Sequence, residues 1–324
     1  MNSHTRLRTG LLAGSAIGLA AAGGCALSAP PPPISVEQHE WTAPDGSGGV
    51  RLLTEHFDLR VTAADPELRK YLGPFMETAF AEYCKLMPPP QEPSDRLAVY
   101  LFGTRQEWAD FTRVSFPAQA HTYLHIHFGG YVDQPTATAV IHDIGRDHTL
   151  SLIAHEGFHQ YLAGCFPEPV HPWLNEGLAC QWEAFDLEGD RPVFTPRRNF
   201  LRRNSLREAL ATPNGLIRLP ELLGMHAGEA VVQAGQPTRA YYAQVWSMVL
   251  LLRQGSGGKY ADRFAKLLGD AGTKRLRIAI GGYRAATQEA EQLSDGEVIF
   301  RHYITEDLDG FMADYEAFAR QLVY

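Results

Sequence analysis

The sequence predicts an α+β protein in which a small α/β sheet unit, residues 50–145, precedes a mostly helical part, residues 146–324. Three observations predict this class. The 324 residues are 45% hydrophobic and 20% charged, which is typical of globular proteins rather than disordered or fibrous ones. Strand and helix patterns alternate in the first unit, and helical periodicity dominates from Asp147 onward.

The first unit contains three strand patterns separated by two helix patterns. Residues 57–62 alternate between apolar and polar side chains, as a half-buried strand does. Asp65 and Pro66 form a typical helix start, a capping residue followed by proline, and the prolines from Pro88 onward end that helix. The remaining patterns are a strand over 97–102, a helix over 105–114 and a strand over 136–142.

The second part is dominated by helix patterns. A helical pattern over residues 150–162 stops at Gly164, and another helix starts at Pro172. Residues 245–252 form an apolar run, and residues 308–322 have the spacing of an amphipathic terminal helix. We expect the last third of the chain to form a core that covers the preceding helices.

Residues 1–24 have the composition of a signal peptide. Arg6 and Arg8 give a positive start, and the apolar run that follows is shorter than the roughly 20 residues that span a bilayer. The segment ends in Ala-Gly-Gly-Cys at Cys25, which resembles a bacterial lipobox whose cysteine carries lipid. Residues 25–49, rich in proline, glycine and polar residues, predict an extended tether.

These features predict an exported protein that a lipid on Cys25 anchors in the bacterial cell envelope. The alternative is a soluble secreted protein that is cut at another small residue. The formal net charge of −8 and the lack of a compensating basic block exclude a generic nucleic-acid binder. Four cysteines are too few for a disulfide scaffold.

The helix that ends at Gly164 carries the motif His155-Glu156-Gly-Phe-His159. Histidines four positions apart lie on one face of a helix, so both imidazoles can bind one zinc ion. Glu156 is rotated by about 100° from His155 and lies beside the metal, where it can take a proton from a zinc-activated water. The alternative is a helix with two surface histidines and a solvated glutamate.

A catalytic zinc ion needs a third protein ligand and an open position. Glu176 follows His159 by 17 residues and lies in the first turn of the helix that starts at Pro172, so we predict that it is the third ligand. Glu183 lies two turns further on the same face and is expected to orient a ligand histidine. Glu168, in the preceding loop, is the second choice for the third ligand.

Together these motifs resemble a known active site. The pattern H-E-x-x-H followed by W-L-N-E-G and a later glutamate is similar to that of gluzincin metallopeptidases, particularly the aminopeptidase N-like branch. It also resembles a group of uncharacterised bacterial proteins with a peptidase-like gluzincin domain. The resemblance covers about residues 55–255 and is specific over residues 155–183. It implies a zincin-type catalytic subdomain, with the active-site helix between the sheet unit and the helical part.

The resemblance also implies residue roles. The implied zinc ligands are His155, His159 and Glu176, with Glu156 as the base and Asn175 and Glu183 as supporting residues. A tyrosine that opens a later helix donates a hydrogen bond to the oxyanion in that branch. Tyr242 matches this position, and Tyr241 is its rival on register.

The expected function is that of an extracytoplasmic, membrane-anchored zinc metallopeptidase. It would hydrolyse peptide or protein substrates with a zinc-activated water and Glu156 as the base. The alternative is a zinc-binding but catalytically silent scaffold or binding lipoprotein of the same fold. The intact Glu156 favours the enzyme, because a purely structural zinc site does not need a base.

Two positions depart from the family patterns. The edge strand that binds substrate in the aminopeptidases carries a glutamate for the free amine, whereas residues 129–133 here offer only a displaced Asp133. The strand is still expected to pair with an extended peptide. Cys180 occupies the position of an aspartate found in thermolysin-like gluzincins.

Three further groups of residues have a weaker claim to a function. His121, His125 and His127 form either a second metal site or, more simply, part of a surface strand. Cys165 and Cys180 are either bridged or two buried free thiols. A basic patch, which is either a solvated helix face or a site for an acidic substrate, comprises Arg197, Arg198, Arg202 and Arg203.

Overall fold

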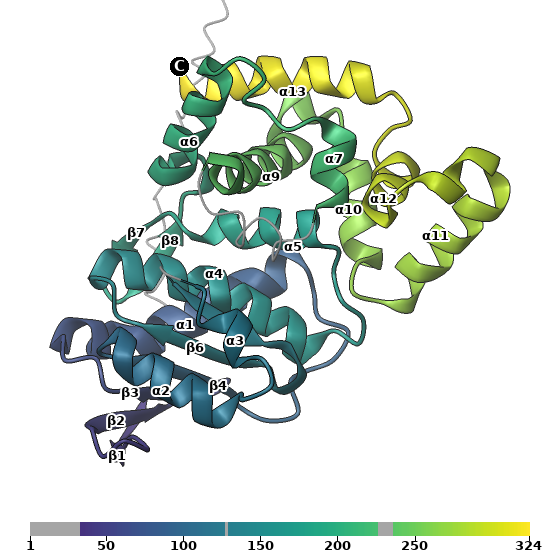
Figure 1. The fold of residues 1–324 in the computed structure, drawn as a ribbon. Coiled ribbons are helices and arrows are strands. Elements are labelled where there is room, and N and C mark those ends of the chain that lie inside the picture. The colour runs from purple at the N-terminus through teal and green to yellow at the C-terminus, as the bar shows by residue number, and fades with distance from the viewer. Residues whose placement is uncertain (1–32, 127–128, 226–235) are drawn as a thin grey trace, which may run out of the picture. The chain divides into compact units, whose positions relative to one another are not determined.

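A six-stranded sheet organises the first half of the chain (Figure 1). The structure is a computed structural model that describes residues 33–126, 129–225 and 236–324. In spatial order the strands are β1 (Glu37–Thr42), β2 (Gly48–Leu53), β3 (Phe57–Val61), β4 (Leu97–Phe102), β6 (Thr138–His142) and β5 (Gly130–Asp133). Together with the helical second half, the sheet confirms the predicted α+β class.

The centre of the sheet is parallel because helices connect its strands. β3, β4 and β6 run parallel, whereas β1, β2 and β5 pair antiparallel with their neighbours. α1 (Pro66–Leu86) connects β3 to β4, and α2 (Arg105–Ser115) follows β4. Asp65 caps α1 as predicted, since its carboxylate accepts hydrogen bonds from the backbone N–H groups of Glu67 and Leu68.

Alternating side chains of β4 divide the sheet into two packed faces. Val99 and Leu101 belong to the main core, which α1 and the helix that carries the histidines also enter. Phe102 points to the opposite face and packs in a smaller cluster with Trp108 of α2. This alternation is the two-residue period of a strand, and it gives the sheet a helical layer on each side.

The prediction of an extended tether is wrong for residues 37–49, the second half of the predicted segment. Residues 37–49 form β1 and the start of β2, paired in register from Glu37 opposite Leu53 to Thr42 opposite Gly48. Most of β1 is exposed, so its stability comes from backbone hydrogen bonds and from Trp41, which packs in the smaller cluster. A strand exposed on both faces needs little hydrophobic patterning, so its polar sequence does not distinguish it from a linker.

The second half contains most of the helices. In chain order they are α4 (Arg146–Cys165), α5 (Pro172–Ala179), α6 (Phe200–Ala211), α7 (Leu219–Gly224), α9 (Gln236–Gln254), α10 (Ala261–Asp270), α11 (Lys274–Ala286), α12 (Asp295–Tyr303) and α13 (Leu308–Val323). In Figure 1, α4 lies next to the sheet, α5 lies above α4, and α9 lies above α5. Within the described ranges, no helix combines the length and the apolar character that crossing a bilayer requires.

A small hairpin interrupts the helical part, which the sequence did not predict. β7 (Phe185–Glu188) pairs antiparallel with β8 (Arg191–Phe194). Phe185 and Phe194 pack against Phe75 of α1, with ring centroids 5.0 and 6.2 Å apart. Residues Ile34–Tyr324 form one compact unit, so the predicted boundary at residue 145 separates layers within that unit and not two domains.

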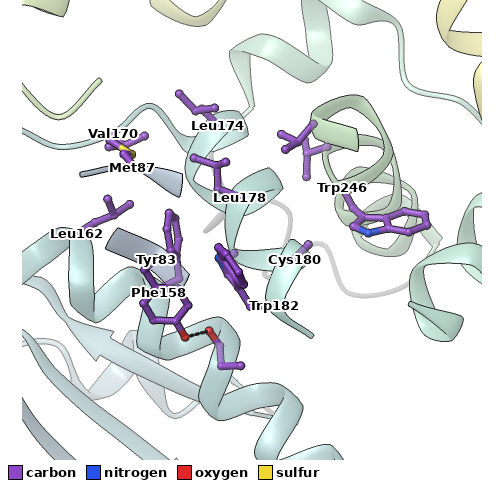
Figure 2. Packing of buried hydrophobic residues seen from close by; sticks show 14 of the residues in the cluster. Tyr83, Met87, Phe158, Leu162, Val170, Leu174, Leu178, Cys180, Trp182 and Trp246 are labelled. Atoms are coloured by element: carbon purple, nitrogen blue, oxygen red, sulfur yellow. Dashed lines mark hydrogen bonds between the residues drawn. The ribbon is translucent and has the colours of Figure 1, made fainter. Parts of the chain in front are cut away.

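Aromatic side chains fix α4 against α1 (Figure 2). The ring of Tyr83 lies 5.4 Å from that of Phe158 and 5.0 Å from that of Trp182 between centroids. The Tyr83 hydroxyl donates a hydrogen bond of 2.6 Å to the carbonyl oxygen of Ala154. Because Ala154 directly precedes His155, this buried contact holds the turn of α4 that begins the segment from His155 to His159.

A half-buried ion pair between Glu77 of α1 and His56 predicts a pH-dependent stability. Glu77 accepts hydrogen bonds from the backbone N–H (2.8 Å) and from Nδ1 (2.7 Å) of His56. The hydrogen bond to Glu77 raises the pKa of His56 above its ordinary value. The charged pair therefore stabilises the fold fully between about pH 4.5, above which Glu77 is ionised in the unfolded chain, and about pH 6.5, and this contribution is lost as the pH rises through the higher folded pKa of His56.

Glu77→Gln should accordingly lower the free energy of unfolding by about 1–2 kcal/mol at pH 6 and by less at pH 9. Urea unfolding of both proteins at the two pH values measures the difference. Glu82→Gln, which removes an exposed carboxylate from the same helix, is the control and should have little effect at either pH. An equal loss at pH 6 and pH 9 for Glu77→Gln would contradict the ionic role of His56.

Candidate metal centre

α4 and α5 bring three metal-binding side chains together. His155 and His159 lie on one face of α4, and their Nε2 atoms are 3.2 Å apart. Oε2 of Glu176, in α5, lies 3.3 Å from Nε2 of His155 and 3.5 Å from Nε2 of His159. Each of the three residues is only 8% exposed. The structure thus assembles the predicted trio and places it in the interior.

These separations fit a tetrahedral zinc ion. With zinc–ligand bonds of about 2.0–2.1 Å, two ligand atoms at tetrahedral positions lie about 3.3 Å apart. Oε2 of Glu176 is also buried without a hydrogen-bond partner among the described residues. A buried carboxylate oxygen without a partner is costly, and a cation at the meeting point of the three atoms would satisfy it.

The outer nitrogen of each histidine is held by a second residue. Nδ1 of His155 lies 2.9 Å from Oε1 of Glu183, and Nδ1 of His159 lies 2.8 Å from Oδ1 of Asn175. Each Nδ1 donates to an oxygen, so each Nε2 keeps its lone pair toward the meeting point. The predicted supporting contacts of Glu183 and Asn175 are therefore present.

Arg202 and Asn199, which sequence reasoning missed, hold Glu183. Arg202 of α6 donates from Nε (2.8 Å) and Nη2 (2.6 Å) to the two carboxylate oxygens, and Asn199 adds a bond of 2.7 Å. The prediction of a solvated or substrate-binding patch is wrong for Arg202, because its guanidinium is buried against Glu183. No local spacing reveals this pair, since Arg202 follows Glu183 by 19 residues.

The charges around the site act in opposite directions. Burial raises the pKa of Glu176, but the imidazoles of His159 and His155, which lie 3.5 and 3.3 Å from Oε2, outweigh burial and hold that pKa well below its ordinary value. Burial raises the pKa of Glu156 above its ordinary value, although both imidazoles oppose this. Among the described residues, none makes a hydrogen bond to the Glu156 carboxylate, which is therefore able to accept a proton.

Both tyrosine candidates lie near the site, but they differ in exposure. Tyr241 is completely buried, and its hydroxyl has no hydrogen-bond partner among the described residues. Tyr242 is partly buried, and its ring centroid lies 6.3 Å from that of His155. The Arg202 guanidinium lies over the Tyr242 ring, 4.8 Å from its centroid. The partial exposure makes Tyr242 the better candidate for contact with a substrate.

A glycine allows α5 to approach α9 closely. Gly177 directly follows the predicted ligand Glu176. A Cβ atom at this position would lie 2.7 Å from the carbonyl oxygen of Val245 and 2.7 Å from a methyl group of Val249. Any larger residue would force the two helices apart, so Gly177 helps to set the distance between Glu176 and the tyrosines of α9.

The structure places the competing candidates elsewhere. Glu168, the second choice for the third ligand, forms an ion pair of 3.0 Å with Arg277 instead. Asp133 is buried in β5, where it accepts hydrogen bonds from Tyr123 and Thr136, so these contacts occupy the displaced substitute for the amine-binding glutamate. β5 is an edge strand as predicted.

The structure also tests the predictions for the cysteines and for the histidine cluster. Cys165 and Cys180 are free, as is Cys84, so the alternative of a bridge is wrong. Cys180 lies within 4.8 Å of His155 and Glu183, and burial raises its pKa to about 11, which keeps the thiol protonated. His121 belongs to α3 (Ala120–Tyr123) rather than to a strand, and His127 lies outside the described residues.

Comparison of the chain with protein-family models, with curated proteins and with solved structures found no match. Two imidazoles and a carboxylate with a supporting shell are typical of a catalytic zinc site, in which three protein ligands leave one position open.

The support of His155 can be tested by removing one charge. Glu183→Gln keeps the side-chain shape but weakens the hydrogen bond to Nδ1 of His155 and leaves Arg202 without its ionic partner. Zinc affinity, measured by competition with a chelator, should fall about 10–100-fold. Asp186→Asn removes a carboxylate that pairs with Arg198 at the surface and should leave zinc affinity unchanged. Wild-type affinity in Glu183→Gln would contradict the supporting role.

Proposed function

We propose that this protein is a zinc metallopeptidase of the gluzincin type that hydrolyses peptide bonds in peptide or protein substrates. One observation carries the proposal. Nε2 of His155, Nε2 of His159 and Oε2 of Glu176 lie 3.2–3.5 Å from one another, and the carboxylate of Glu156, the next residue after His155, has no hydrogen-bond partner among the described residues. This combination joins a three-ligand zinc site to a free general base.

The residues of the chain have separate tasks in this reaction. A zinc ion, when bound, supplies the Lewis acidity that polarises the substrate carbonyl and makes water acidic. Glu156 takes the proton of the attacking water and delivers it to the leaving amine. Tyr242 donates a hydrogen bond to the oxygen on which negative charge develops. Glu183 and Asn175 hold both imidazoles in the orientation that the ligands need.

The free carboxylate of Glu156 separates this function from a zinc-binding but silent scaffold. A structural zinc site has four protein ligands and no need for a base, whereas this one has three ligands and an unpaired glutamate beside them. The alternative, a catalytically silent lipoprotein, predicts a different result in the experiment below: the protein would bind zinc and cleave no peptide.

The test combines metal analysis with peptide cleavage. Purified protein should contain about one zinc ion per chain. It should cleave members of a synthetic peptide mixture, as measured by mass spectrometry, and lose this activity with a chelator and regain it with zinc. Zinc without cleavage across the mixture would favour the silent lipoprotein. Protein without zinc after loading would remove the metallopeptidase proposal altogether.

The proposed location in the cell depends on Cys25, which lies outside the described residues. In a bacterial host that processes lipoproteins, the wild-type protein should fractionate with membranes and its N-terminal peptide should carry lipid. Cys25→Ser should move most of the protein to the soluble fraction, because a lipid chain supplies the anchor. An equal membrane fraction for both proteins would contradict the lipobox prediction.

A further inference from the structure

A cavity of about 620 Å³ lies where the C-terminal ends of α1 and α9 meet α10, β8 and the short helix η2 (Cys180–Trp182). Aromatic and aliphatic side chains make up much of its wall, among them Trp182, Phe194, Phe264 and Leu268. Its volume lies in the range of sites that bind small organic molecules, about 300–1,000 Å³. The cavity is large enough to take up a ligand with an apolar body.

Arg253 gives this cavity an unpaired positive charge. It lies in the last turn of α9 and is partly buried, and it makes no hydrogen bond or ion pair with another described residue. Burial lowers its pKa, and no neighbouring carboxylate opposes this effect. A partly buried guanidinium without a partner is unfavourable in free energy, which an anionic ligand would relieve.

The charges of the other two charged residues of the wall, Lys85 and Glu82, cancel each other. Lys85 and Glu82 line the rim and form an ion pair of 2.6 Å with each other. The wall therefore carries one net positive charge, on Arg253, whose planar fork matches a carboxylate. This favours a ligand with one negative charge over a phosphate, which would bring two.

The cavity is separate from the candidate metal centre. Arg253 follows Tyr242 by three turns of α9, a distance of about 16 Å along the helix. Its wall nevertheless includes Gln181 and Trp182, which belong to the segment between Glu176 and Glu183. Oε1 of Gln181 and Nε1 of Trp182 are buried without hydrogen-bond partners among the described residues. Both atoms are shielded from solvent, so neither offers a hydrogen bond to a ligand in the cavity.

We propose that this cavity binds a small organic monocarboxylate with an apolar body, whose carboxylate pairs with Arg253 and whose body packs against the aromatic wall. The ion pair forms in a partly desolvated place, where a bidentate arginine contact is strong. The apolar body removes from water the exposed apolar surface of the wall, to which Val193, Phe194 and Leu268 contribute.

The probe for this site is 4-phenylbutyrate, compared with 4-phenylbutanamide, its neutral counterpart of almost equal shape. Isothermal titration of the wild-type protein should show one saturable site for the carboxylate and affinity for the amide at least about tenfold lower, the difference expected for a charge-assisted pair. Equal affinity for the two ligands, or no saturable binding of the carboxylate, would overturn the proposal.

Two variants assign the binding to Arg253. Arg253→Gln should weaken binding of the carboxylate at least about tenfold and leave the amide unchanged. Arg253→Lys keeps a positive charge at the end of α9 but lacks the planar fork of arginine. Its affinity for the carboxylate should therefore lie between those of the wild type and Arg253→Gln. Carboxylate affinity unchanged in Arg253→Gln would overturn the assignment. The comparison of the two ligands on the wild-type protein does not depend on the folding of either variant.

A metal control separates this proposal from the zinc site. A carboxylate bound by the metal would be lost after treatment with a chelator, whereas a carboxylate bound by Arg253 would not. Chelator-treated and zinc-loaded protein should therefore bind 4-phenylbutyrate equally. Binding only by the zinc-loaded form would overturn the Arg253 site and at the same time support the metal centre, so the two proposals can fail separately.

Discussion

Replacing Glu156 by glutamine should lower peptide hydrolysis about 10²–10⁴-fold while the protein still binds one zinc ion per chain. Glutamine has nearly the same shape but cannot accept the proton of the attacking water. The two proposed ligand histidines should keep their orientation, because their hydrogen bonds run to Glu183 and Asn175 and not to Glu156. Initial rates on a cleaved peptide, together with the zinc content of the same sample, measure both quantities.

Glu188→Gln is the matched control for this substitution. It makes the same chemical change at an exposed position of the β7–β8 hairpin, so rate and zinc content should match the wild type. A Glu156→Gln variant with wild-type rates would show that another group is the base, and the proposed mechanism would fail.

Replacing Glu176 by alanine should have the largest effect on zinc itself. The variant loses the only carboxylate among the three ligands, and the remaining pair of imidazoles binds zinc less tightly than the complete set. Zinc affinity should fall by more than the about 10–100-fold expected for a supporting residue such as Glu183. Because a metal that binds the folded state stabilises it, zinc should raise the melting temperature of the wild type much more than that of the variant.

Glu168→Ala is the control, since Glu168 precedes α5 and pairs with Arg277 at the surface. It should keep the wild-type zinc affinity and the wild-type rise in melting temperature. Equal zinc affinity in Glu176→Ala and in the wild type would exclude Glu176 as a ligand, and the gluzincin assignment would be lost with it.

The parts of the site that the sequence predicts are those that depend on local geometry. The spacing of His155 and His159 puts both rings on one face of any α-helix, and Pro172 starts the helix on which Glu176 stands. These positions could be predicted because each depends on the geometry of one helix or one short turn. The predicted place of Glu183, two turns further on the same helix, is wrong, because α5 ends at Ala179 and a 3-10 turn, η2, follows it. The chain still brings Glu183 to Nδ1 of His155.

The parts that the sequence does not predict depend on packing between distant elements. Arg202 lies in a cluster of arginines that is typical of a solvated face, and only the position of α6 beside Glu183 turns it inward. β1 has few apolar residues in alternation, because most of it remains exposed, and its pairing with β2 comes largely from backbone hydrogen bonds, which leave no pattern in the sequence. The β7–β8 hairpin has strands of only four residues, and the packing of Phe185 and Phe194 against Phe75 depends on the distant helix α1.

The short distances along the chain between the ligands and their supports imply an order of assembly during folding. His155 and Glu183 are 28 positions apart, and His159 and Asn175 are 16 apart. Closing such short loops costs little chain entropy, so α4 and α5 can pair early. Tyr242 arrives only when α9 packs against α5 at Gly177. We therefore expect pulsed hydrogen exchange during refolding to show protection in α4 and α5 before α9, with the nascent ligand cluster formed ahead of the tyrosine.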